Sequence, residues 1–275
     1  MAITGSILET LDHLVLRPKT ISKFGRNPDV ANNATEKVWP YGGSSGFNFA
    51  TANETLFAVS DDATDTMIVT VYEPLKENAA GDWIPQPDAT VTLNGLTPVQ
   101  ITADTYIRTS RARAMEDNAG TIFILTSTDV TAGVPDTVTE VRAVIGPLRI
   151  QTEMAMWTVP SGFGNFWFHS WEAGINNVAN AGGARETNFD LCLREFGDSG
   201  FRISDPHPAV KDGTSAFHKR FELPFPDDRG LPPKTDLFAQ ADVTGGDTDV
   251  MAKFALANWP SNFRNHTEWH HAMTR

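Results

Sequence analysis

The stretch Ala89-Thr-Val-Thr-Leu-Asn-Gly-Leu-Thr-Pro-Val-Gln-Ile101 decides the fold class. Its first five residues alternate between apolar and polar side chains, which is the period of a half-buried β-strand. Asn94-Gly95 follows, and this dipeptide favours a tight type I′ turn, because both central residues of that turn need positive φ. We therefore expect Thr97 to Ile101 to return as the partner strand of a hairpin.

Segments of the same kind lie on both sides of this hairpin, and none of them has the pattern of a long amphipathic helix. Each segment is short, alternates in polarity or clusters β-branched residues, and ends at polar, glycine or proline residues. Repeated short strands with polar turns favour a β-sandwich or a jelly roll. The expected strands are 67–72, 105–113, 120–126, 140–145, 156–160, 164–172, 189–196, 216–223, 236–241 and 250–256.

The length of 275 residues predicts two domains of ordinary size. Gly146-Pro147 ends the first block of strands. The predicted fold class is therefore mainly β, with an N-terminal extended arm followed by two β-sandwich domains. We expect the arm over residues 1–43, the first sandwich over 44–147, a jelly-roll-like second sandwich over 148–260, and a loose tail over 261–275.

The arm is predicted from the residues that interrupt regular structure. A glycine, two prolines and two adjacent asparagines crowd residues 24–40, too many for a packed element. Phe24 and Trp39 would then anchor an extended strap on another subunit, and a disordered terminus is the alternative. On the strap interpretation, deleting residues 1–43 leaves a folded protein that no longer associates with its assembly.

Charge and cysteine content narrow the function classes. The chain has 22 Lys and Arg against 34 Asp and Glu, a formal net charge of -12, whereas coating a nucleic acid requires clustered cations. Its single cysteine, Cys192, excludes an intrachain disulfide framework. The N-terminus has no secretory pattern, and no apolar run is long enough for a membrane span. We expect a protein made in a cytoplasm, without nucleic-acid or membrane partners.

Four short motifs carry a family resemblance: Phe24-Gly-Arg-Asn-Pro-Asp29, Thr35-Glu-Lys-Val-Trp39, Thr90-Val-Thr-Leu-Asn-Gly-Leu-Thr-Pro-Val99 and Thr158-Val-Pro-Ser-Gly162. In this order and spacing the chain resembles a family of tailed-bacteriophage virion structural proteins. The last motif departs from the family pattern T-V-P-A-G, because Ser161 replaces its alanine.

The resemblance implies a non-enzymatic protein without a cofactor, most simply a capsid decoration (cement) protein on the head exterior. It implies a homotrimer made in the host cytoplasm, with the major capsid protein as its partner. A head-fibre, neck or tail component is the alternative within this class. A carbohydrate-binding or glycan-cleaving module of the adsorption apparatus is the alternative from another class, because jelly rolls host both functions. The expected interface residues are Phe24, Arg26, Asn27, Asp29, Trp39 and Tyr41.

Catalytic and metal signatures are incomplete. Gly197-Asp-Ser-Gly200 resembles the surroundings of a serine nucleophile, but Ser199 has no recognisable base, so a plain turn is favoured. His266 and His270 would share a helix face and could bind zinc, whereas a solvated tail is the simpler interpretation. Asp242, Asp247 and Asp249 could surround Ca²⁺ or form an ordinary acidic hairpin loop. We therefore predict no catalytic, cofactor or metal residue.

Three tryptophans stand in polar segments. Trp39, Trp83 and Trp269 have proline, asparagine or charged neighbours, a context in which exposed aromatic side chains anchor interfaces. The alternative is that they cover sandwich edges within one subunit.

Overall fold

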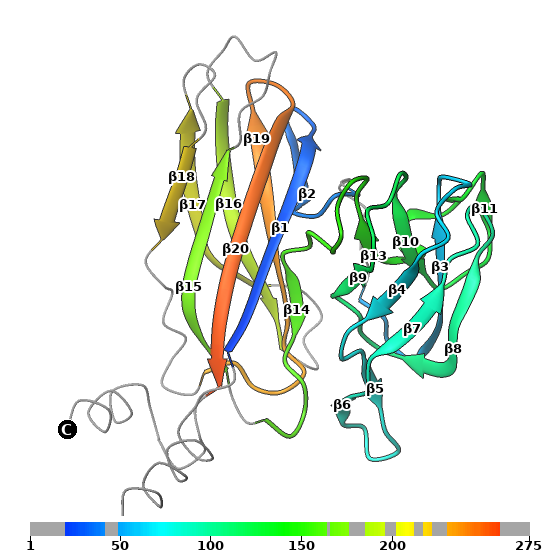
Figure 1. The fold of residues 1–275 in the computed structure, drawn as a ribbon. Helices are drawn as coiled ribbons and strands as arrows, with labels where there is room; N and C mark the ends of the chain where they lie inside the picture. The colour runs from blue at the N-terminus through cyan, green and yellow to red at the C-terminus, as the bar shows by residue number, and fades with distance from the viewer. Residues whose placement is uncertain are drawn as a thin grey trace, which may run out of the picture.

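The computed structural model describes residues 20–41, 49–163, 166–175, 185–195, 202–211, 217–221 and 230–258. These residues form antiparallel strands joined by turns, and the single helix among them is a 3₁₀ turn, η1 (Val138–Glu140). The prediction of a mainly β protein is confirmed. The strands form two units, which we call the terminal unit and the central unit (Figure 1). Within the described ranges, no helix has the length and apolarity that a membrane span requires.

The terminal unit combines strands from both ends of the sequence. One of its sheets has the order β1-β20-β15-β18 and the other the order β14-β19-β16-β17, with β2 also paired to β19. β2 and β14 lie end to end along one edge of β19, because they pair with different parts of it. The strands are β1 (Thr20–Val30), β2 (Ala34–Lys37), β14 (Met156–Thr158), β15 (Phe166–Ile175), β16 (Arg185–Arg194), β17 (Arg202–Lys211), β18 (Phe217–Phe221), β19 (Asp236–Thr244) and β20 (Thr248–Asn258).

The core of the terminal unit contains side chains of both sheets. Trp171 of β15 and Phe254 of β20 belong to the same buried cluster as Phe189 and Leu191 of β16. All four are fully buried. Such large rings remove the most apolar surface from water and are the main source of stability in a core of this kind.

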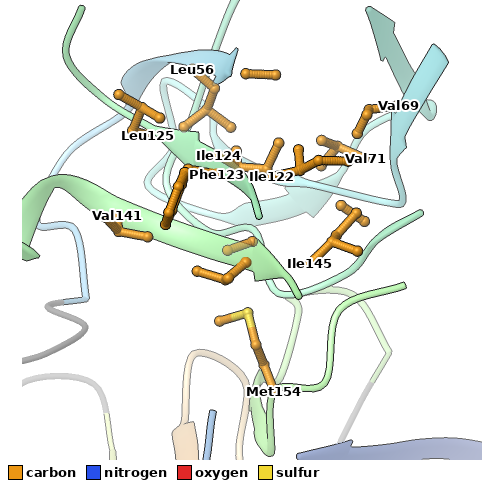
Figure 2. Packing of buried hydrophobic residues seen from close by; sticks show 14 of the residues in the cluster. Leu56, Val69, Val71, Ile122, Phe123, Ile124, Leu125, Val141, Ile145 and Met154 are labelled. Carbon is orange, nitrogen blue, oxygen red and sulfur yellow. The ribbon is translucent and has the colours of Figure 1, made fainter. Parts of the chain in front are cut away.

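The central unit lies between β2 and β14 in the sequence. Its main sheets have the orders β13-β10-β3-β8 and β7-β4-β9, and β5-β6 and β11-β12 are separate hairpins. Figure 2 shows how side chains such as Val69 and Ile122 from the two main sheets form one core. The strands are β3 (Glu54–Ser60), β4 (Ile68–Val71), β5 (Leu75–Glu77), β6 (Trp83–Pro85), β7 (Ala89–Thr92), β8 (Val99–Tyr106), β9 (Ala112–Ala114), β10 (Ile122–Leu125), β11 (Val130–Thr131), β12 (Val134–Pro135) and β13 (Val141–Ile145).

The turn predicted at Asn94-Gly95 is present in a different form. Its central residues are Gly95 and Leu96, because Asn94 bridges Thr97, and only Gly95 has positive φ (54°). One positive φ at the first central position is the pattern of a type II′ turn, so the prediction of type I′ is wrong. The flanking strands do not pair with each other, since β7 pairs with β4 and β8 pairs with β3. The turn therefore links two sheets and does not close a hairpin.

The N-terminal segment also differs from the prediction. Residues 20–37 are not an unpacked arm, because β1 pairs with β20 and β2 pairs with β19. The strap interpretation is wrong for these residues, which complete both sheets of the terminal unit. Residues 1–19, where the predicted arm begins, and the predicted tail at 261–275 lie outside the described residues.

The residues that interrupt regular structure have specific positions in this pairing. A Cβ atom on Gly25 would lie 2.3 Å from the backbone nitrogen of Ala155, so only glycine allows this close approach. Pro28 lies at the register shift between Asn27 and Val30, where the ladder needs no backbone donor. Asn33, in the turn to β2, has φ of 58°, a conformation that asparagine tolerates better than most residues.

Candidate functional site

The predicted interface motif lies in β1, where Arg26 forms an ion pair with β20. Its Nε and Nη2 donate to the two carboxylate oxygens of Asp249, at 3.0 and 2.8 Å. Such a two-pronged geometry is the strongest form of charge-assisted hydrogen bond. The hydrogen bond to Asp249 raises the pKa of Arg26 above its ordinary value. Arg26 is thus engaged within its own chain.

Asn27 and Glu36 connect the two N-terminal motifs. The Asn27 amide, which is buried, donates to Glu36 Oε2 at 3.0 Å and to the carbonyl of Lys37 at 3.2 Å. The other oxygen of Glu36 accepts the backbone N–H of Ala31 at 3.1 Å, inside the turn. Asn27 Oδ1 accepts the N–H of Asp29 at 3.1 Å. The two motifs therefore form one network that fixes the β1–β2 turn.

Trp39 packs against the central unit of the same chain. Its ring is fully buried and meets Tyr41 edge-on at 5.7 Å, and Tyr41 meets Phe123 of β10 at 5.3 Å. Burial raises the pKa of Tyr41. Trp39 is therefore not available as an anchor for another subunit. Phe24 and Asp29 remain exposed, so of the predicted interface residues these two are the most accessible to a partner.

A second cluster joins the two units. Arg108, which follows β8, donates to both carboxylate oxygens of Asp236 at the start of β19, at 2.8 and 2.9 Å. Thr158 Oγ1 and Arg194 Nη2 donate to the same carboxylate, at 2.6 and 2.5 Å. The Arg108 guanidinium also lies over the ring of Trp83, 4.4 Å from its centroid. Thr158, the first residue of the fourth motif, therefore has a structural role at this junction.

Ser161 adds another contact between the units. Its hydroxyl accepts the backbone N–H of Trp83 at 3.0 Å, and its own N–H donates to the Trp83 carbonyl at 2.8 Å. An alanine at this position would keep the second bond and lose the first. Trp83 is buried at this contact, which agrees with the alternative that it covers an edge within one subunit.

A crevice lies where β1 passes the segment that connects β8 to β9. Lys23 is 7% exposed, and its ammonium donates to the carbonyl of Ser110. Two cavities, of about 110 and 250 Å³, share Lys23, Ser22 and Arg111 in their linings. Burial first, and then the nearby charge of Arg111, lower the pKa of Lys23 to about 7.

The acidic loop that could have held Ca²⁺ is the β19–β20 turn. Asp242 lies within β19 and Asp249 within β20. Asp249 binds Arg26 of β1, and Asp247 accepts the backbone N–H of Asn32 at 2.9 Å in the β1–β2 turn. Nowhere in the described ranges do three or more His, Cys, Asp or Glu side chains gather as metal ligands would. Ser199, His266, His270 and Trp269 lie outside these ranges.

Cys192 of β16 is buried, although it alternates along the strand with the polar residues Asp190 and Arg194. Its side chain is buried with Phe238 on the face of the β14-β19-β16-β17 sheet that meets the central unit, while Leu191 enters the core of the terminal unit. Burial raises the pKa of the Cys192 thiol to about 12. The strand is covered on both faces, which is why the alternation of polarity did not predict its surroundings. A protonated, inaccessible thiol of this kind is chemically inert.

No family model matches the chain, and no curated protein matches it. Among solved structures, a chain from the infectious bursal disease virus Gx strain is 11% identical with a TM-score of 0.28, over 90% of this chain and 74% of that one. A chain from the T=1 particles derived from infectious bursal virus is 11% identical with a TM-score of 0.26, over 89% and 71%.

Sequence reasoning missed the junction and the crevice. Arg108 and Asp236 are 128 positions apart, and Lys23 and Ser110 are 87 apart, so no local motif joins them. The available signal was modest: Arg108 directly follows two apolar residues and Asp236 directly precedes two, so a charge at either position would be unfavourable without a partner.

Proposed function

We propose that this chain is a bacteriophage virion structural protein that decorates the exterior of the capsid as a homotrimer, with the major capsid protein as its partner. In this role it binds without catalysis and raises the stability of the particle, because a ligand that binds only the assembled state shifts the equilibrium towards it.

The observation that carries the proposal is that two of the four motifs meet in space. Phe24–Asp29 and Thr35–Trp39 build one network around Asn27 and Glu36, and these segments pair with β20 and β19. The motifs therefore belong together as one structural module. This supports extending the virion-protein resemblance from short strings to the terminal unit.

An exposed apolar surface on the central unit supports a role in assembly. Four exposed apolar side chains lie on neighbouring segments, and we call them the apolar patch: Ile68, Met115, Leu148 and Ile150. The Met115 N–H donates to the Ile68 carbonyl, and the Ala114 N–H donates to the Ile150 carbonyl, so three of these residues lie on hydrogen-bonded segments. Ile68 and Met115 lie opposite each other where β4 begins and β9 ends, and adjoining exposed apolar side chains favour protein association.

Leu148 is the most exposed member of the patch. Its side chain is 75% exposed, and its backbone has φ of 58°, a conformation that is unfavourable for leucine. A strained backbone that presents a large apolar side chain to solvent lowers the stability of the isolated chain. A contact with the capsid would cover this side chain and explain its position.

The direct test is a cryo-EM reconstruction of particles that carry this protein. Density for it on the head surface, repeated with the capsid lattice, supports decoration. Density confined to a single vertex or to the tail would replace decoration with the neck, fibre or tail alternative.

A binding experiment tests the mechanism. We expect strong binding to expanded particles and weak binding to isolated capsid subunits, because a trimer gains avidity only when several neighbours are in place. Equal affinity for both would contradict the cement role. Saturable binding or hydrolysis of bacterial surface glycans by the purified protein would favour the adsorption-module alternative.

A further inference from the structure

The crevice beside Lys23 has a composition unlike the rest of the chain. The larger cavity, of about 250 Å³, is lined by Ser22, Lys23, Phe24, Arg111, Gln151 and Thr152. This lining contains two cations and no carboxylate, in a chain with 34 acidic and 22 basic residues. All its polar side chains are able to donate a hydrogen bond.

The positive charge of Lys23 is only partly compensated by the groups around its ammonium. An ammonium has three donors, and the carbonyl of Ser110 is the one acceptor that the described part of the chain provides for its side chain. No carboxylate forms an ion pair with Lys23 within those residues. A buried cation of this kind is unfavourable unless an anion or further acceptors complete its surroundings.

Arg111 and Glu73 also line the crevice. The guanidinium of Arg111 lies over the ring of Tyr72, 5.1 Å from its centroid, and this contact orients the side chain. Glu73, which lines the smaller cavity, has φ of 41°, and its N–H donates to Asp88 Oδ1 at 3.0 Å. Strained residues held by a specific hydrogen bond are a feature of binding sites.

We propose that this crevice is an oxyanion-binding site, in which Lys23 and Arg111 bind one carboxylate or phosphate group between the two units. Ser22, Gln151 and Thr152 provide further donors. The cavities are smaller than a typical cofactor site of 300 Å³ or more, so a single acidic group fits better than a large ligand. The site does not depend on the virion role proposed above.

Two sources could supply the oxyanion: a free phosphate ion, or the carboxylate of an acidic side chain on a partner. The experiment measures binding of sodium phosphate and of sodium glutarate to the full chain, by calorimetry and by the shift in melting temperature, against sodium chloride at matched ionic strength. We expect saturable binding beyond the chloride response. Tighter binding of phosphate would identify a phosphate-bearing ligand, and tighter binding of glutarate would identify a partner's carboxylate.

Two variants and one control locate the site. Lys23→Met and Arg111→Gln should each weaken binding at least about tenfold, because each removes a charge-assisted hydrogen bond. Lys253→Met is the matched control, since Lys253 is exposed on β20, opposite Phe24, and outside both linings. Arg111 is exposed, so its variant should fold even where Lys23→Met does not.

The pH dependence gives a further readout. The charged or titratable groups that line the two cavities with Lys23 are Arg111, Glu73 and Tyr72. Glutarate should bind more tightly as the pH falls from about 8.5 to 6, because Lys23 gains its proton in that range. A chloride-like response of the wild type, or equal weakening by Lys253→Met, would overturn the proposal.

Discussion

Arg108 and Asp236 form a two-pronged ion pair across the boundary between the two units, with side chains that are only 5% and 2% exposed. The pair joins the end of β8 to the start of β19. Because Asp236 also accepts from Thr158 and Arg194, the carboxylate is the centre of the junction. The central and terminal units are therefore held by a buried polar cluster in addition to apolar contacts.

The first prediction is that Asp236→Asn strongly destabilises the protein. The change leaves Arg108 buried without a counter-charge, and breaking such a pair from one side costs about 3–5 kcal/mol of unfolding free energy. Urea unfolding followed by circular dichroism and tryptophan fluorescence measures this loss.

A surface ion pair provides the control. Lys76 and Asp104 are also 2.8 Å apart, but their side chains are 35% and 64% exposed. Lys76→Met should cost at most about 1 kcal/mol, because water already solvates both charges. Equal losses from Asp236→Asn and Lys76→Met would show that the buried pair does not stabilise the junction.

The second prediction concerns the turn between β7 and β8. Gly95→Val should lower the unfolding free energy by about 2 kcal/mol or more, because a β-branched residue is strained at φ of 54°. The added Cβ would also lie 2.6 Å from the carbonyl oxygen of Ala63. Leu96→Ser, at the neighbouring exposed position, should lower the unfolding free energy by less, and thermal unfolding of both variants measures the difference. Similar decreases would contradict a turn whose central residues are Gly95, at positive φ, and Leu96.

The strands with clear period-two alternation were predictable from the sequence, because this alternation follows directly from the geometry of a strand that is covered on one face. Nine of the ten expected segments contain a single strand. The exception is 105–113, which the structure divides between the end of β8 and β9, because the chain leaves the sheet around Arg108. Besides β1 and β2, the strands that were not predicted are β3, β5, β6, β11, β12 and β17. β17 contains prolines at 206 and 208, which argue against a strand but are tolerated at the edge of a sheet.

The strand pairing of residues 20–37 was not predictable from local sequence patterns. Gly25 and Pro28 usually interrupt strands, and only the contact with Ala155 and the bulge after Asn27 reveal why they are needed in β1. The partners of β1 and β2 lie more than two hundred positions away, in β19 and β20. Local sequence cannot encode which distant edge a strand completes.

The third prediction is that Glu36→Ala destabilises the β1–β2 turn. The variant removes one of the two acceptors of the buried Asn27 amide and the acceptor of the Ala31 N–H, and a buried donor that loses its acceptor costs about 1–3 kcal/mol. Thermal unfolding measures the effect. Asp29→Ala, at an exposed position of the same motif, is the control and should leave the melting temperature nearly unchanged.

Deleting the N-terminal segment tests whether the fold requires the pairing of β1 with β20 and of β2 with β19. Deleting residues 1–43 should abolish folding, because β20 would lose its partner β1 and β19 would lose its partner β2. Both strands would then expose unpaired backbone groups along one edge. A folded, soluble truncated protein would restore the interpretation of this segment as a separable arm.

The fourth prediction concerns pH. The pKa of Lys23 falls from 10.5 to about 7 on folding, mainly through burial. Between these values the unfolded chain retains a proton that the folded chain has lost, so the contribution of Lys23 to stability rises with pH above about 7. Lys23→Met should therefore be more stable than the wild type at pH 6, and this advantage should diminish towards pH 9. An advantage that grows with pH would contradict the lowered pKa.

The fifth prediction separates binding from folding at the apolar patch. Leu148→Asn should leave the unfolding free energy unchanged or raise it by up to about 1 kcal/mol, because asparagine tolerates the positive φ better than leucine. The same variant should reduce association with expanded capsids, since it removes the most exposed apolar side chain of the patch. Val134→Thr, an exposed apolar position on β12, is the matched control and should retain full association. Co-sedimentation with particles measures binding and thermal unfolding measures stability. Equal association of both variants with the capsid would mean that the patch is not the docking surface.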